Sequence, residues 1–189
     1  SAESVPDIRQ ATLTFIGVDG KKVQEVVTFE NVDGMAVFQG DIILGKTEEL
    51  LHGTYTQALT EDGVNLQGLY KTTVGAKWPN GRVPFVISTA ISTADRNAIT
   101  TYMSEIEAVA RVEFVPRTNE AAYINIIPTS DTGICGSSVL GRSGGKQDLK
   151  LRCFTQRTIT HELMHALGFL HEQMRADRDQ YVTIHWSNI

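Results

Sequence analysis

The chain has 189 residues, 41% of them hydrophobic, and a formal net charge of −5. This length and composition suit one well-packed core with a smaller appendage. The negative charge argues against nucleic acid or an anionic membrane surface as a partner, and no apolar run approaches the roughly 18 residues that a membrane span needs.

Residues 1 to about 70 differ from the rest of the chain because they are rich in strand signals. The segments 11–16 and 23–29 are β-prone, and Asp19-Gly20 between them is a favourable hairpin turn. A second such pair, Asp33-Gly34, leads into the apolar segment 35–38. We therefore predict a β-hairpin followed by a further strand.

The polar stretch from Glu48 to Gln67 shows little periodicity, so it is expected to form irregular chain on the surface or a connection between two units. His52 lies in this stretch. A lone histidine in a polar connection is usually solvated, and no role is assigned to it.

The next segment alternates between strand and helix signals. Ser92 followed by Asp95 forms a capping box and predicts the start of a helix. That helix is expected to lay one face on a sheet, because apolar residues recur at helical spacing. These residues are Ile99, Met103, Ile106 and Val109. The predicted strands are the β-run that ends at Ile87, Val112–Val115 and Tyr123–Ile127.

A glycine-rich segment follows, and Gly144-Gly145-Lys146 within it invites comparison with a phosphate-binding loop. A Walker motif would need glycine in place of Leu140 and serine or threonine in place of Gln147. A nucleotide site is therefore excluded.

The segment from His161 to Glu172 contains three histidines and a glutamate at spacings that indicate a metal site. On a helix, His161 and His165 lie about 40° apart around the axis, so both imidazoles can reach one ion. His171 can join them only if the helix ends first. Gly168 is the predicted end, because glycine readily adopts the left-handed conformation that reverses the chain.

Three neutral imidazoles leave one position on Zn²⁺ open, which is the arrangement of a catalytic site. Glu162, next to the first histidine, is the candidate general base for water that the zinc activates. The alternative is an ordinary core helix with histidines at its edge. Five fixed positions match by chance about once in three million starting points, so zinc is favoured.

This run resembles the zinc signature of the metzincin clan, and its continuation through Arg175-Ala176-Asp177-Arg178-Asp179 resembles the astacin family specifically. The segment 181–189 is similar to the astacin segment that follows, and the likeness extends from Trp78 to Ile189. The resemblance implies an α+β fold. In it, a metzincin-like amino-terminal lobe has a twisted mixed sheet, a backing helix and an active-site helix, and a short β-rich pro-segment precedes the lobe.

The resemblance implies a domain division into a latency pro-segment, 1–70, and the amino-terminal lobe of a zinc metallopeptidase, 71–189. The sequence Phe38-Gln39-Gly40-Asp41 is similar to the family's pro-segment motif, in which the aspartate binds zinc and displaces the catalytic water. Asp41 is thus the expected fourth ligand, with a simple turn cap as the alternative. Activation is expected to require a cut between about Gln67 and Thr73.

The resemblance also assigns roles around the cleft. Gly136, Ser137, Ser138 and Val139 correspond to an edge strand that pairs with extended substrate, with a plain edge strand as the alternative. Cys135 and Cys153 correspond to a disulfide, which implies an oxidising compartment and secretion. Glu172 corresponds to the buried partner of the freed amino terminus, with an exposed helix-end carboxylate as the alternative.

The family pattern continues beyond Ile189 with a carboxy-terminal lobe, which is not in this chain. We expect the same precursor or a second chain to supply it. The predicted function is that of a secreted zinc-dependent endopeptidase in zymogen form, with a polypeptide substrate. Two alternatives remain: a zinc-containing fragment that binds peptides without cleaving them, and a pro-segment that inhibits other proteases.

Overall fold

The computed structural model describes residues 5–16, 22–51 and 77–171. These residues form β1 (Ile8–Ile16), β2 (Lys22–Val32), β3 (Met35–Phe38), β4 (Ile42–Lys46), α1 (Thr47–Leu51), the 3-10 helix η1 (Pro79–Gly81), β5 (Arg82–Ile87), α2 (Thr93–Val109), β6 (Glu113–Pro116), β7 (Tyr123–Pro128), β8 (Gly136–Val139), β9 (Lys146–Leu151) and α3 (Gln156–Leu167).

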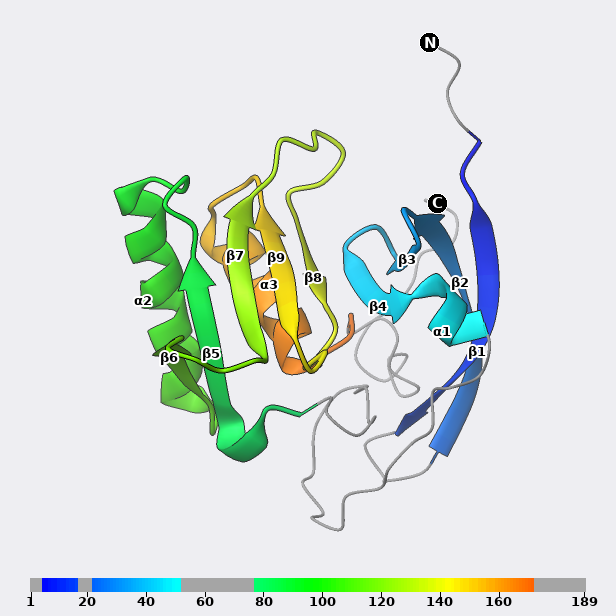
Figure 1. The fold of residues 1–189 in the computed structure, drawn as a ribbon, viewed down its shortest axis with the longest axis horizontal. Helices are drawn as coiled ribbons and strands as arrows, with labels where there is room; N and C mark the ends of the chain where they lie inside the picture. The colour runs from blue at the N-terminus through cyan, green and yellow to red at the C-terminus, as the bar shows by residue number, and fades with distance from the viewer. Residues whose placement is uncertain (1–4, 17–21, 52–76, 172–189) are drawn as a thin grey trace, which may run out of the picture.

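The described strands form one mixed sheet in the order β1-β2-β3-β4-β8-β9-β7-β5-β6. Strands β1 to β4 pair antiparallel with their neighbours, as consecutive strands joined by short turns do. In the second half, β7, β5, β6 and β9 run parallel, and β8 is antiparallel to β9. A short parallel pairing between β4 and β8 joins the halves (Figure 1).

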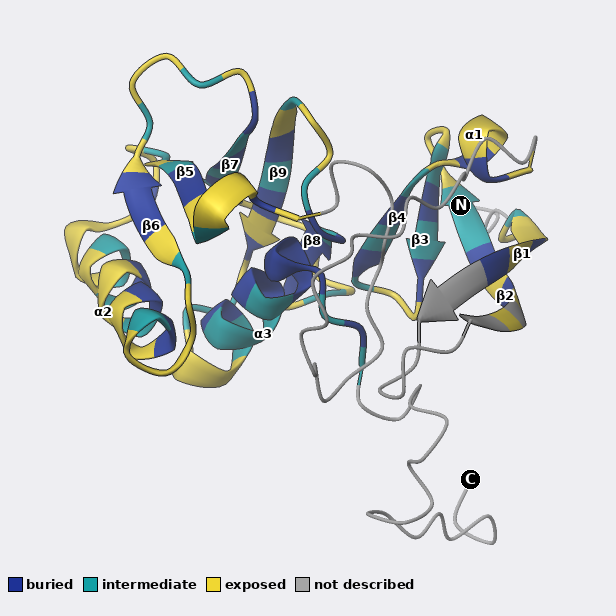
Figure 2. Ribbon diagram, turned by 90° about the horizontal axis from the view of Figure 1, so that it is seen from below, coloured by how far each residue is buried: buried dark blue, intermediate teal, exposed yellow. Residues whose placement is uncertain are grey.

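Helices α2 and α3 cover the same face of the second half of the sheet (Figure 2). Apolar residues of α2, such as Ile99 and Met103, pack with Ile159 and Leu163 of α3 and with the strands in one core. Trp78 adds a hydrogen bond between residues that are distant in sequence, because its buried indole N–H donates to the carbonyl of Ala166 at 2.9 Å. Helix α3 is therefore held by packing against α2 and the strands and by the hydrogen bond from Trp78.

A second core lies under β1 to β4. Alternate residues of β3 and β4, including Ala36, Phe38, Ile42 and Leu44, point into it, as the period of a half-buried strand requires. Leu140 and Leu170 of the second half belong to the same core. The amino-terminal unit, which comprises β1 to β4 and α1, thus completes its core with two leucines from outside it, and one of them, Leu170, directly precedes His171.

Helix α2 begins as the sequence predicts. Ser92 is its N-cap and accepts from the N–H of Asp95 at 3.1 Å. Ile99, Met103 and Ile106 are buried, but the expectation for Val109 is wrong, because Val109 is 87% exposed. It lies about 80° around the helix from Ile99.

Two further corrections concern the amino-terminal unit. The stretch expected to be irregular from Glu48 onward begins with the helix α1, because Leu50 enters the second core. β1 and β2 also extend beyond the predicted runs. The predicted Asp19-Gly20 turn, His52 and the cleavage region 67–73 lie outside the described residues.

The predicted disulfide is confirmed: Cys135 and Cys153 are bonded, with their Cα atoms 4.9 Å apart. It joins the start of β8 to the chain between β9 and α3. Among the described residues, no helix is long and apolar enough to cross a membrane.

Candidate metal centre

The local sequence of α3 explains how its histidines meet. Thr155 is the N-cap and accepts from the N–H of Thr158. The helix ends at Gly168, which has a φ of 109° and the left-handed conformation expected there. Its N–H and that of Phe169 donate to the carbonyls of His165 and Met164. This reversal returns His171 to the face that carries the other two histidines.

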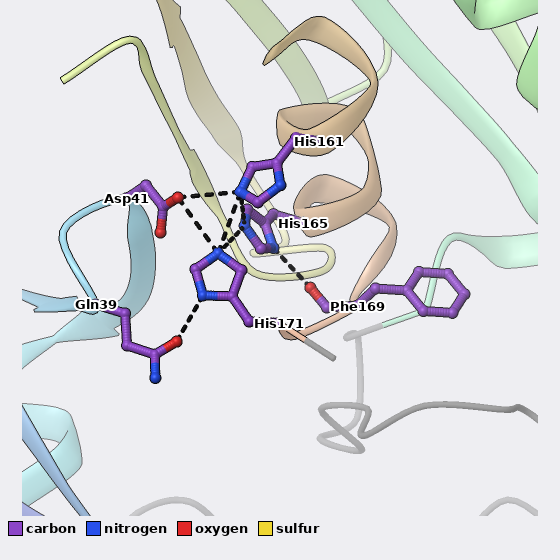
Figure 3. Close-up of polar contacts among 6 residues, drawn as sticks. All are labelled: Gln39, Asp41, His161, His165, Phe169 and His171. Carbon is purple, nitrogen blue, oxygen red and sulfur yellow. Dashed lines mark hydrogen bonds and ion pairs between the residues drawn. The ribbon is translucent and has the colours of Figure 1, made fainter. Parts of the chain in front are cut away.

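The three imidazoles converge on one point (Figure 3). The Nε2 atom of His165 lies 2.9 Å from that of His161 and 3.2 Å from that of His171. The Nε2 atoms of His161 and His171 are 3.1 Å apart. Asp41 joins them from the β3–β4 loop, with its Oδ2 atom 3.0 Å from His161 Nε2 and 3.3 Å from His171 Nε2.

The protonation pattern of this group fits a cation. The Nδ1 atom of His165 lies 2.7 Å from the carbonyl oxygen of Phe169, which can only accept, so Nδ1 carries the proton. Burial lowers the pKa of His165 to about 4, which keeps the ring neutral. The Nε2 lone pair of His165 therefore faces two other imidazole nitrogens and a carboxylate. These four ligand atoms lie within 4.8 Å of one another, so one metal ion could bind all of them.

Asp41 is held in its ionised form. Burial raises the pKa of its carboxyl, but the hydrogen bond with His161 and the charges of the histidines outweigh it and hold the pKa below its ordinary value. The Oδ1 atom of Asp41 is buried without a hydrogen-bond partner among the described residues. A carboxylate in this state is an oxygen donor suited to Zn²⁺.

Glu162, next to His161 on α3, is buried. It is 2% exposed, and its Oε2 atom has no hydrogen-bond partner among the residues described. Burial, with the negative charge of Asp41, raises the pKa of Glu162 to about 8. A Cβ atom built on Gly136 would lie 2.8 Å from the Cγ and Oε1 atoms of Glu162. Glycine at residue 136 therefore leaves the room that this carboxyl occupies.

The predicted substrate strand is β8, and its outer edge is occupied by β4. The N–H of Ser138 donates to the carbonyl of Asp41 at 3.0 Å, and the N–H of Leu140 donates to that of Ile43 at 3.0 Å. The structure thus places the amino-terminal unit along the edge that was predicted to receive substrate. Substrate binding by Gly136 to Val139 stays a prediction, and Glu172 lies outside the described residues.

The sequence analysis missed two residues near the site. Gln39 lies with its Oε1 atom 2.5 Å from His171 Nδ1, and its place two residues before Asp41 was the available signal. Gln147 is buried and donates to the carbonyl of Gly141 at 2.7 Å. Gly141 in turn donates its N–H to the carbonyl of His165. The sequence signal for Gln147 was a polar glutamine at a strand position that is followed at every second residue by a leucine that points into the core.

Comparison with known proteins adds relatives in nematodes and fish. The chain is 42% identical over 134 residues to zinc metalloproteinase nas-8 of Steinernema carpocapsae, which covers 68% of this chain and 30% of the relative. It is 37% identical over 147 residues to low choriolytic enzyme of Oryzias latipes, covering 75% of this chain and 53% of the relative. The chain thus spans between about a third and a half of these curated relatives.

A solved structure of high choriolytic enzyme 1, a hatching enzyme zinc-protease from Oryzias latipes, matches with a TM-score of 0.51 and 42% identity, over 60% of this chain and 57% of that chain. This match confirms the predicted fold class. The family model described as Astacin, a peptidase family, matches residues 71–189. Zinc, the predicted cofactor, is the metal of this family and suits the donors found here. The chain belongs to the astacin family.

Proposed function

We propose that this chain carries the zinc-dependent endopeptidase centre of its family in a latent form. The observation that carries the proposal is the convergence of His161, His165 and His171 with Asp41 on one point, beside the buried carboxyl of Glu162. Three imidazoles on a helix and its reversal provide an open site for zinc, and the fourth donor comes from the other unit.

In the proposed mechanism, His161, His165 and His171 hold the metal. Zinc held there would act as a Lewis acid, which would lower the pKa of water and polarise a peptide carbonyl. Glu162 takes the proton from water and passes it to the leaving amine. The burial of Glu162 supports this role, because its Oε2 atom has no hydrogen-bond partner among the described residues and is therefore available to exchange a proton with water.

Latency in this proposal has two sources. Asp41 takes the position on the metal that water needs, and its ionised carboxylate supports that role. Strand β4 covers the edge of β8, to which an extended polypeptide substrate would add by strand pairing. Removal of residues 1–70, after a cut between about Gln67 and Thr73, would free both.

The remaining assignments follow from the same proposal. Residues 71–189 form the amino-terminal lobe, and a carboxy-terminal lobe in the same precursor or in a second chain completes the cleft. Glu172 would pair with the freed amino terminus. The disulfide between Cys135 and Cys153 supports secretion, because such bonds persist in oxidising compartments.

The test is peptide cleavage by the activated full-length protein with and without a chelator, together with Glu162→Gln. This variant keeps its zinc ligands and is expected to bind zinc but to lose turnover. Turnover in Glu162→Gln would overturn the role of Glu162. Zinc binding by the wild type without any cleavage would instead favour a non-catalytic peptide-binding module.

A further inference from the structure

Different parts of the chain orient His165 and His171. The Nδ1 atom of His165 donates to the backbone carbonyl of Phe169, which belongs to the lobe. The Nδ1 atom of His171 lies 2.5 Å from the side-chain Oε1 of Gln39, which belongs to the β3–β4 loop of the amino-terminal unit (Figure 3). The amino-terminal unit therefore supplies the hydrogen-bond partner of the Nδ1 atom of His171, the ring nitrogen that faces away from the proposed metal.

The backbone of the loop favours a residue other than glutamine. Phe38 pairs with Ile42, so the loop has three residues, and Gln39 and Gly40 have φ angles of 52° and 87°. The left-handed region suits glycine or asparagine better than glutamine. Gln39 thus occupies a place that backbone preference alone would not give it, and its side chain reaches the imidazole.

The same loop contacts both nitrogens of one ring. The carboxylate of Asp41 lies against Nε2 of His171, while the amide of Gln39 lies against Nδ1. With its oxygen toward the ring, the amide only accepts, so Nδ1 keeps its proton and Nε2 keeps the lone pair that a metal needs. Partners of this kind tune metal affinity because they fix the tautomer and orientation of a ligand.

We propose that Gln39 is a positioning residue that sets the tautomer and orientation of His171 and thereby helps the latent protein to retain zinc. The inference rests on the proposed function for the identity of the metal. It gives the amino-terminal unit a second task besides blocking the site, because His171 loses this partner when the unit leaves.

The first measurement is the rate at which the full-length protein, with residues 1–70 attached, releases zinc to a chelator. Gln39→Gly removes the acceptor and is expected to release zinc about ten-fold faster, the size of effect typical of such outer partners. Gln39→Glu keeps an oxygen acceptor at the same reach, so its release rate is expected to stay near that of the wild type.

A matched control is available in the turn between β2 and β3. Asp33 also has a left-handed backbone, with a φ of 50°, and precedes a glycine, but it is far from the imidazoles in the sequence and in the sheet. Asp33→Gly relieves the backbone in the same way and is expected to leave zinc release unchanged. Equal acceleration in both variants would show a general loosening of the unit and would overturn the proposal.

Two further readouts separate positioning from a purely structural role. Glycine suits a φ of 52°, so Gln39→Gly is expected to keep or raise the unfolding midpoint of the metal-free protein while zinc release becomes faster. The nitrogen chemical shifts of His171 in the metal-free protein should report a proton on Nδ1 in the wild type and a mixture of tautomers in Gln39→Gly.

An unchanged release rate and an unchanged tautomer in Gln39→Gly would overturn the proposal. If the wild-type protein took up no zinc, the proposed function would fail, and the tautomer measurement would still decide whether Gln39 orients His171.

Discussion

The carboxyl of Glu162 fills the space that a side chain on residue 136 would need. A Cβ atom on Gly136 would meet the Cγ and Oε1 atoms of Glu162 at 2.8 Å, which is closer than such contacts occur in proteins. Strand β8 and helix α3 thus approach each other closely because one residue lacks a side chain. The relationship places the candidate base beside the strand predicted to bind substrate.

Gly136→Ala is therefore expected to displace Glu162 without removing a metal ligand. In the activated full-length protein, we expect kcat/KM for a peptide substrate to fall by roughly 100-fold, the lower end of what a misplaced general base costs. Zinc content, measured in the same preparation, is expected to stay at the wild-type level.

Gly145→Ala is the control for this variant, because a Cβ at residue 145 would meet no atom of the described residues within 4 Å. Its kcat/KM is expected to match the wild type. A Gly136→Ala enzyme with full activity would show that Glu162 tolerates the displacement or is not the base.

Asp41→Asn tests latency. The amide is a weaker metal ligand than the carboxylate and removes the charge that faces His161 and His171. We expect the uncut Asp41→Asn precursor to cleave a short peptide more slowly than the activated protein, because β4 still covers the edge of β8, whereas the wild-type precursor stays inactive. Asp33→Asn, in the turn before β3, changes a carboxyl of the same unit away from the site and should remain latent. Latency that survives in full in Asp41→Asn would mean that Asp41 is not the switch and that the pairing of β4 with β8 is sufficient for latency.

The stability of the metal-free protein is expected to depend on pH through Glu162. Its pKa rises from 4.5 in the unfolded chain to about 8 in the folded protein, so the folded state holds the extra proton between these values. The resulting stabilisation is complete below pH 4.5 and is lost as the pH rises through 8. The pKa of His165 falls from 6.5 to about 4, which gives the opposite slope, but only below pH 6.5.

Between pH 6.5 and 8, the titration of Glu162 affects the stability and that of His165 does not. Urea unfolding in the presence of a chelator should show a free energy of unfolding that decreases by up to about 1.4 kcal/mol per pH unit over this range. Glu162→Gln is expected to flatten the decline. A free energy that increases with pH in the wild type would contradict the burial of a neutral carboxyl.

The disulfide is expected to stabilise the hairpin that carries β8. Cys135 and Cys153 close a loop with a sequence separation of 18, and the chain-entropy relation gives about 3 kcal/mol for a loop of this length. The double variant Cys135→Ser/Cys153→Ser should lower the free energy of unfolding by about that amount under oxidising conditions. Adding a reductant should lower the stability of the wild type similarly and leave the double variant unchanged.

Features that depend on short stretches of chain were predictable. The spacing of His161 and His165, the end of the helix at Gly168 and the capping box at Ser92 each follow from helix geometry and backbone preference over a few residues. The same holds for β3, whose predicted bounds match the structure. The prediction for Val109 was wrong because this residue lies about 80° around the helix from Ile99, at the margin of the buried face.

Features that depend on distant contacts were not predictable. Gln39 meets His171 across 132 positions of sequence, and β4 covers the edge of β8 from the other unit. Leu140 and Leu170 are likewise distant in sequence from the amino-terminal unit, and yet both are buried in its core.

By itself, the sequence determined the candidate chemistry of this protein: a histidine set that can hold a metal, an adjacent carboxyl and the family to which they belong. Only the tertiary structure decided which groups surround that set, such as the amide that faces His171 and the strand that covers β8. The physical reason is that helix period and glycine conformation act along neighbouring residues, whereas burial, pKa and strand pairing depend on the packing of segments far apart in the chain.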